Sequence, residues 1–194
     1  MSVVACVASR YGSWVAYDGR GRNNVTGLIV SENIIKAKMV NKTVCVGYTG
    51  TLELAEKVIS VLTSEENKSA VSVMSSDSVV DAVQKVFSAV RYPQDMSAQF
   101  LVVGVNSSGR MAMYTIDSQK KIACFDPSDT APIRFAVLSN GEHGVSLEPY
   151  VLQEIKCGGL SNTSIVTGLT KFIHTVADKD DSVNKNVKII ELRT

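Results

Sequence analysis

Residues 1–19 read MSVVACVASRYGSWVAYDG, and this stretch decides the expected fold. After the initiator Met1 comes a run of β-branched and small residues, then a tight turn at Gly12, then a second run that ends in Asp18-Gly19. This pattern predicts two strands joined as a hairpin. We expect no leader before the first strand.

Ser2 is the residue of this stretch that is equipped for chemistry. A small second residue permits removal of Met1, which would leave Ser2 with both a hydroxyl and a free α-amine. An α-amine has a reference pKa of about 7.7–8.0, so part of it is unprotonated near neutral pH and can act as a base. A nucleophile and a base on one residue are a known variant of the catalytic triad. The alternative is an ordinary edge strand, since many proteins begin Met-Ser.

The composition predicts one globular domain that covers residues 1–194. Hydrophobic residues make up 45% of the chain and charged residues 20%, which is ordinary for such a domain. The net charge of +1, with scattered Lys and Arg, argues against a nucleic-acid partner and against an anionic membrane surface. No apolar run approaches the roughly 18 residues of a membrane span. We therefore expect a cytoplasmic protein with neither nucleic-acid nor membrane partners.

Cysteine and histidine usage predicts neither a metal site nor a cofactor. The cysteines are far apart and form no Cys-x-x-Cys pair: Cys6, Cys45, Cys124 and Cys157. The histidines, His143 and His174, have no identifiable partner, so we expect no zinc site and reduced thiols. Cys6 is a rival nucleophile in principle, but it falls in mid-strand and is expected in the core.

Hydrophobic periodicity predicts the order strands, two helices, strands, two helices, one strand. Further strands are expected at residues 25–30, 34–40, 43–48, 99–105, 110–116, 122–125, 133–138 and 186–193. The first helix is expected to open at residues 49–51 and the second at a capping-box-like start at Ser78, ending before Pro93. A loop is expected at residues 64–76, and two more helices at 146–156 and 163–177. Paired helices outside two face-to-face sheets give an α+β fold, a four-layer αββα sandwich.

Two features of the first sixty residues add to this hairpin start. In the expected strand 34–40, alternation places Lys36 and Lys38 on one face and Ala37 on the other. Gly47 and Gly50 stand where a strand runs into a helix and allow close backbone approach.

With these motifs in place, the chain resembles the proteasome β-type family of N-terminal-nucleophile hydrolases, and in particular its HslV-like members. Ser2 falls on the family's nucleophile, Asp18-Gly19 on its Asp-Gly, and Lys36 on its catalytic lysine after a short insertion. The glycine turn before the first helix is matched by residues 47–50. Near residues 137–141 the chain is similar to the family's Gly-Ser-Gly turn, with Ser139 on the serine.

The loop at residues 180–184 is similar to a family loop that places Asp181 on an aspartate. The chain also departs from the family. The nucleophile is Ser rather than the usual Thr, and Asn184 replaces a serine near the terminal amine. Leu138 and Asn140 replace glycines on either side of Ser139.

The resemblance implies a set of roles. The Lys36 ammonium would favour the ionised Ser2 oxygen, and Asp18 would hold Lys36 charged and oriented. The Gly47 amide would stabilise the oxyanion, and Ser139 and Asp181 would bond near the Ser2 amine. The alternatives without a catalytic role are a solvent-facing lysine for Lys36, a hairpin Asp-Gly turn for Asp18 and a simple strand-to-helix turn for Gly47.

The implied activity is hydrolysis of peptide (amide) bonds without a cofactor. The implied partners are a peptide or unfolded-protein substrate, further copies of the chain in a homo-oligomeric ring, and an ATPase unfoldase. A catalytically inactive ring or scaffold protein of the same fold is the alternative, and a small-molecule amidase is a third reading. From the sequence alone, Lys36→Ala is expected to abolish turnover with the fold intact, and Asp18→Asn to be milder.

Overall fold

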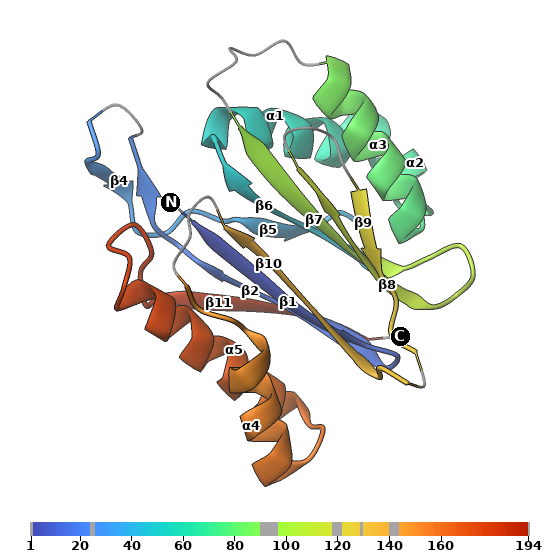
Figure 1. The fold of residues 1–194 in the computed structure, drawn as a ribbon. Coiled ribbons are helices and arrows are strands. Elements are labelled where there is room, and N and C mark those ends of the chain that lie inside the picture. Colours follow the sequence, from blue (N-terminus) through green and yellow to red (C-terminus); the bar gives the residue numbers. More distant parts are fainter. Residues whose placement is uncertain are drawn as a thin grey trace.

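The computed structural model describes residues 2–23, 26–89, 97–117, 122–128, 130–139 and 144–193. Two antiparallel sheets lie face to face, and helices cover the outer face of each sheet (Figure 1). The expected α+β fold, a four-layer αββα sandwich, is confirmed.

The first sheet has the strand order β10-β1-β2-β11. Its strands are β1 (Val3–Ser9), β2 (Gly12–Asp18), β10 (Ile133–Ser139) and β11 (Val187–Arg193). The hairpin predicted for the start of the chain is present, because β1 pairs with β2 from Ser9–Gly12 up to Val4–Tyr17. Every residue of these two strands is buried, which follows from a sheet that is covered on both faces.

The second sheet has the order β5-β6-β7-β8-β9, beside a separate two-stranded ribbon, β3-β4. Its strands are β5 (Ala37–Met39), β6 (Val44–Gly50), β7 (Ala98–Val105), β8 (Met111–Ile116) and β9 (Ile122–Phe125). The ribbon consists of β3 (Gly21–Arg22) and β4 (Ile29–Ser31).

The strand predicted at residues 34–40 is too long, because β5 begins at Ala37. Lys36 therefore precedes the strand, and the predicted alternation is wrong: Lys36 and Ala37 are both buried, whereas Lys38 and Met39 are exposed. The cause is a tertiary contact. The Ile34 amide donates to the Gly19 carbonyl at 2.7 Å, which ties the residues before β5 to the end of the first sheet as well as to β6.

Two helices cover each sheet, and a fifth, short helix packs against the first helix. They are α1 (Leu52–Thr63), α2 (Glu65–Val71), α3 (Ser76–Ala89), α4 (Glu148–Gly158) and α5 (Asn162–Ala177). The loop expected at residues 64–76 was wrong, since α2 lies there; it buries only Val71 and so shows no apolar stripe. The start expected at Ser78 was also wrong. The Val79 amide donates to the Ser75 carbonyl, so Ser78 already lies within the first turn of α3. Pro93 and Val90 lie outside the described residues.

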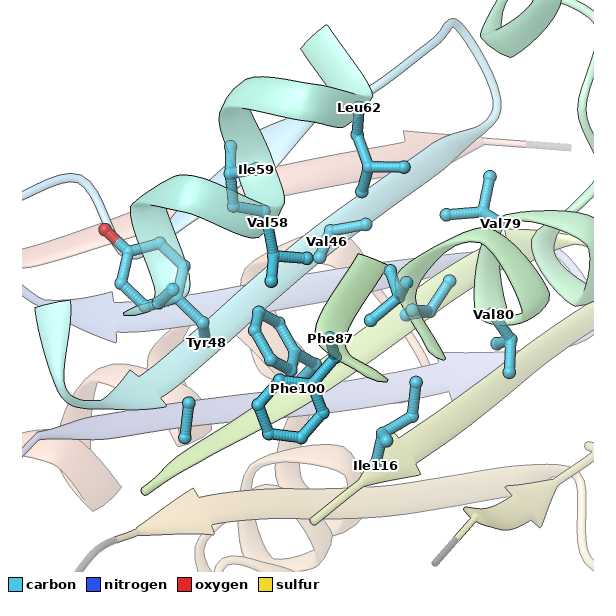
Figure 2. Close-up of a cluster of buried hydrophobic side chains, with 14 of the residues drawn as sticks. Val46, Tyr48, Val58, Ile59, Leu62, Val79, Val80, Phe87, Phe100 and Ile116 are labelled. Atoms are coloured by element: carbon cyan, nitrogen blue, oxygen red, sulfur yellow. The ribbon is translucent and has the colours of Figure 1, made fainter. Parts of the chain in front are cut away.

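Hydrophobic side chains fill all three interfaces between the four layers. Figure 2 shows the one between the second sheet and its helices, where Phe87 of α3 meets Phe100 of β7 edge-on, with ring centroids 5.4 Å apart. Strand β6 supplies two interfaces, because Val46 and Tyr48 face the helices while Cys45 faces the other sheet. This alternation is why β6 reads as a nearly continuous apolar run.

Cys6 lies in the core between the sheets, as the sequence predicts. Burial raises the pKa of Cys6 well above its ordinary value and that of Cys45 to about 12, so both thiols stay neutral and unreactive. Among the helices of the described ranges, none has the length and apolar character needed to cross a membrane.

Candidate active site

The site is built around Asp18, the last residue of β2, which is fully buried. Its Oδ1 atom accepts hydrogen bonds from the Val3 amide at 2.9 Å and from Lys36 Nζ at 2.7 Å. Its Oδ2 atom accepts from the Arg20 amide at 2.9 Å. Three donors on one carboxylate fix its orientation.

Lys36 is the second buried charge of the site, with 3% of its side chain exposed. Burial lowers the pKa of Lys36 from its ordinary value, the Asp18 charge and hydrogen bond act in the opposite direction, and the Arg20 charge lowers it further. The backbone at Lys36 is fixed as well, because its carbonyl accepts from the Tyr48 amide of β6 at 2.8 Å. The lysine is therefore held between the two sheets rather than on a solvent-facing edge.

Ser2 lies directly before β1 and is partly buried. Its peptide bond to Val3 supplies the N–H that Asp18 accepts, so one carboxylate oxygen is shared between the backbone at Ser2 and the Lys36 ammonium. The structure thus brings Ser2, Asp18 and Lys36 together. Met1 lies outside the described residues.

Ser139 closes the neighbouring strand β10, where it stands opposite Val3 in the ladder. It is partly buried and lies at the same end of the sheet as Ser2. Asn140 and Gly141, which complete the predicted turn, lie outside the described residues, as does His143.

Gly47 lies inside β6, opposite Ala37 on one side and Leu101 on the other. A Cβ atom there would stand 2.9 Å from Cγ1 of Val4, so close packing of the two sheets accounts for the glycine. Gly50, at the end of the same strand, has a φ of +104°, which favours glycine for a separate reason. The turn predicted at residues 47–50 is therefore wrong, because these residues lie within β6; its two glycines are one packing position and one conformational position.

Asp181 is placed differently from the other predicted residues. Its side chain is exposed, and its main-chain carbonyl, rather than its carboxylate, accepts from the Arg20 guanidinium. The carboxylate of the preceding Asp180 bonds within its own turn, accepting from the Ser182 amide at 2.8 Å and from the Ser182 hydroxyl. At Asp181 the loop thus reaches the site through its backbone.

Sequence reasoning missed two polar residues next to Asp18, Arg20 and Glu32, and it singled out Asn184 only as a departure from the family. Arg20 Nε donates to both Glu32 oxygens at 3.1 Å, and its Nη2 lies 3.0 Å from Oε1. Asn184 is buried; it accepts from the Gly19 amide at 3.0 Å and donates to the Glu32 carboxylate. Only the departure of Asn184 from the family's serine could have drawn attention to this network.

His174 lies on α5, and its Nε2 is 3.2 Å from the Lys185 carbonyl. Within the described ranges, no group of three His, Cys, Asp or Glu side chains is arranged to hold a metal ion.

Comparison with solved structures identifies the fold. Eukaryotic HslV from Trypanosoma brucei matches with a TM-score of 0.63 and 15% identity, over 99% of this chain and 99% of that chain. The Anbu complex from Pseudomonas aeruginosa, described as a helical assembly, matches with a TM-score of 0.73 and 16% identity, over 98% of this chain and 81% of that chain. No family model and no curated protein matches the sequence. The chain therefore has a proteasome-like, HslV-like fold, and the resemblance seen in the sequence is confirmed at the level of the fold.

Proposed function

We propose that this chain, which has the fold of HslV, hydrolyses peptide (amide) bonds with Ser2 as the N-terminal nucleophile after removal of Met1. The observation that supports this best is the shared Asp18 oxygen, which accepts from both the Val3 amide and the Lys36 ammonium. Packing alone does not require this buried ion pair of 2.7 Å, because hydrophobic residues of similar volume often stabilise a core equally well.

The proposed reaction runs in two steps. Ser2 Oγ attacks the substrate carbonyl carbon while the Ser2 α-amine takes the hydroxyl proton, and the proton then passes to the leaving amine as the C–N bond breaks. Water attacks the carbonyl carbon of the resulting ester while the free amine takes one of its protons. The C–O bond to Ser2 then breaks, the carboxylic acid leaves, and the amine returns that proton to Ser2 Oγ. No cofactor is needed for this balance.

The remaining residues of the site supply charge and position. The Lys36 ammonium favours the ionised Ser2 oxygen, and Asp18 keeps the ammonium oriented. We propose that the oxyanion donor is a backbone amide of β6, either that of Gly47 within the strand, as the sequence suggests, or that of Gly50 at the end of the strand. Ser139 is retained as a residue near the amine, because it pairs with Val3. For Asp181 we propose a contribution through its carbonyl rather than its carboxylate.

A free amine on Ser2 is the requirement that separates this function from others. We expect protein that begins at Ser2 to cleave fluorogenic peptides, and protein with an uncleaved extension before Met1 to be inactive although it keeps Ser2. Intact mass verifies each N-terminus, and Ser2→Ala with a processed end is the matched control. Activity of the extended form would contradict the amine as base, because that form has no free amine at Ser2.

An inactive scaffold of the same fold is the second candidate. It is favoured by Asn184, whose side chain is engaged with Gly19 and Glu32, and by the exposed carboxylate of Asp181. Protein that begins at Ser2 and still cleaves neither peptides nor small amides would support it. Cleavage of small amides alone would support the amidase reading.

We further propose that the chain assembles with copies of itself in a cytoplasmic ring supplied with unfolded protein by an ATPase unfoldase. A head-to-tail interface is satisfied when a ring closes. The surface also carries exposed apolar side chains suited to such contacts, including Leu28 at 68% and Val30 at 61% exposure. Sedimentation at micromolar concentration is expected to show a closed oligomer, and a monomer would contradict the ring.

A further inference from the structure

Arg20 is the centre of a polar network that lies behind the Asp18–Lys36 pair. Its amide donates to Asp18, its guanidinium is held by both oxygens of Glu32, and its Nη1 donates to the Asp181 carbonyl. Asn184 joins the same Glu32 carboxylate to the Gly19 amide. Three segments of the chain, at residues 18–20, 32–36 and 180–186, therefore meet at the Glu32 carboxylate.

The segment that carries Asp18 has little freedom to move. The Gly19 amide donates to Asn184 Oδ1, and the Gly19 carbonyl accepts from the Ile34 amide at 2.7 Å. A Cβ atom on Gly19 would stand 2.5 Å from the Glu32 carbonyl oxygen, so the two backbones are in direct contact. Figure 1 shows the loop after α5, which contains Asn184, at the end of the first sheet where β1 begins.

We propose that Glu32 and Asn184 are positioning residues: Asn184 fixes the segment that carries Asp18, and Glu32 both orients Arg20 and neutralises its charge beside Lys36. The inference rests on the proposed function, because it assigns the network to the same site. Neither residue acts on the substrate. Each acts through the Asp18–Lys36 pair.

The charges around Lys36 give this proposal a measurable sign. Among the described residues, Asp18 and Arg20 are the charged groups that act on Lys36, in opposite directions, and Glu32 faces Arg20. Hydrogen bonds from Arg20 and then from Asn184 hold the pKa of Glu32 below its ordinary value, so Glu32 is ionised and can offset the arginine. Both Arg20 and Glu32 are partly exposed, so solvent reduces the effect without changing its sign.

The test measures the pKa of Lys36 directly, by NMR titration of ¹³C-labelled lysine, with Lys36→Met used to assign its signal. Glu32→Gln keeps the side-chain shape and removes the charge, so the uncompensated Arg20 is expected to lower the pKa of Lys36. Arg20→Gln is expected to raise it. Arg20→Lys keeps the charge and is expected to leave the pKa near that of the wild type, which separates charge from shape.

Glu154→Gln is the matched control, because Glu154 pairs with Lys171 at 2.6 Å in the outer helix layer, away from the Asp18–Lys36 pair. If Arg20→Gln fails to fold, Glu32→Gln alone decides the sign. A Lys36 pKa that does not move, or that moves in the same direction in both variants, would overturn the proposal.

Kinetics supply the second readout. Asn184→Ala is expected to lower kcat by roughly tenfold with little change in KM, because it misplaces the catalytic pair without touching substrate. In Glu32→Gln the alkaline limb of the rate profile is expected to move to lower pH, as Lys36 loses its proton earlier. If Glu32→Gln and Arg20→Gln shift the Lys36 pKa in opposite directions but the protein cleaves no peptide, the positioning network is supported and the proposed function is contradicted. The two proposals can therefore fail separately.

Discussion

Lys36→Met is expected to lower kcat/KM for a peptide substrate by about 10²–10³, the cost typical of losing one preorganised charge-stabilising group. The ammonium is buried and shares an Asp18 oxygen with the backbone at Ser2, and a neutral water molecule cannot replace its charge. Methionine keeps most of the side-chain length. Ser2→Ala is expected to be at least as damaging, and the double variant no worse than the more damaging single one, because the residues act as one unit.

The chain provides a matched control for this loss in Lys38, which lies two residues later and is exposed on β5. Lys38→Met removes the same charge from the same segment. It is expected to keep nearly full activity, because Lys38 is exposed and does not pair with Asp18. A fully active Lys36→Met protein would show that the lysine is structural and would favour the scaffold reading.

Lys36→Met is also expected to destabilise the fold by about 3–5 kcal/mol, because it leaves the fully buried Asp18 carboxylate without its ion partner. Asp18→Asn is expected to have an effect of similar size. It leaves Lys36 unpaired, and its amide group replaces an acceptor of hydrogen bonds with a donor. By contrast, Glu53→Gln removes an exposed pair with Lys57 and is expected to cost no more than about 1 kcal/mol.

Urea unfolding of the two single variants and of Asp18→Asn/Lys36→Met closes a double-mutant cycle. The double variant is expected to recover much of the lost stability, because no uncompensated charge remains buried, while its activity stays low. Strictly additive losses would mean that the two side chains do not interact. These expectations replace the ones drawn from sequence, in which Lys36→Ala spared the fold and Asp18→Asn was mild, because burial of both charges was not visible there.

Local chemistry in the sequence was enough to predict the layers of this protein. A β-branched run, a turn at Gly12 and a second run specify the β1–β2 hairpin, since strand pairing between neighbours needs only short-range pattern and turn residues. The apolar stripes of α1, α3 and α5 specify which faces they bury, because helical periodicity is written in the residues themselves. Ser2 could be singled out by its chemistry behind Met1, and Asp18 and Lys36 by the resemblance to the proteasome β-type family.

Tertiary structure alone decided how those residues are held. Lys36 lies just before β5, in a segment whose Ile34 amide bonds to Gly19, a partner that no local pattern reveals. Asn184 reaches Gly19 across 165 positions of the chain, and helix α2 forms although it buries only Val71. Periodicity reports a residue's neighbours along one element, whereas burial of a charge and the identity of its partner depend on which segments the fold brings together.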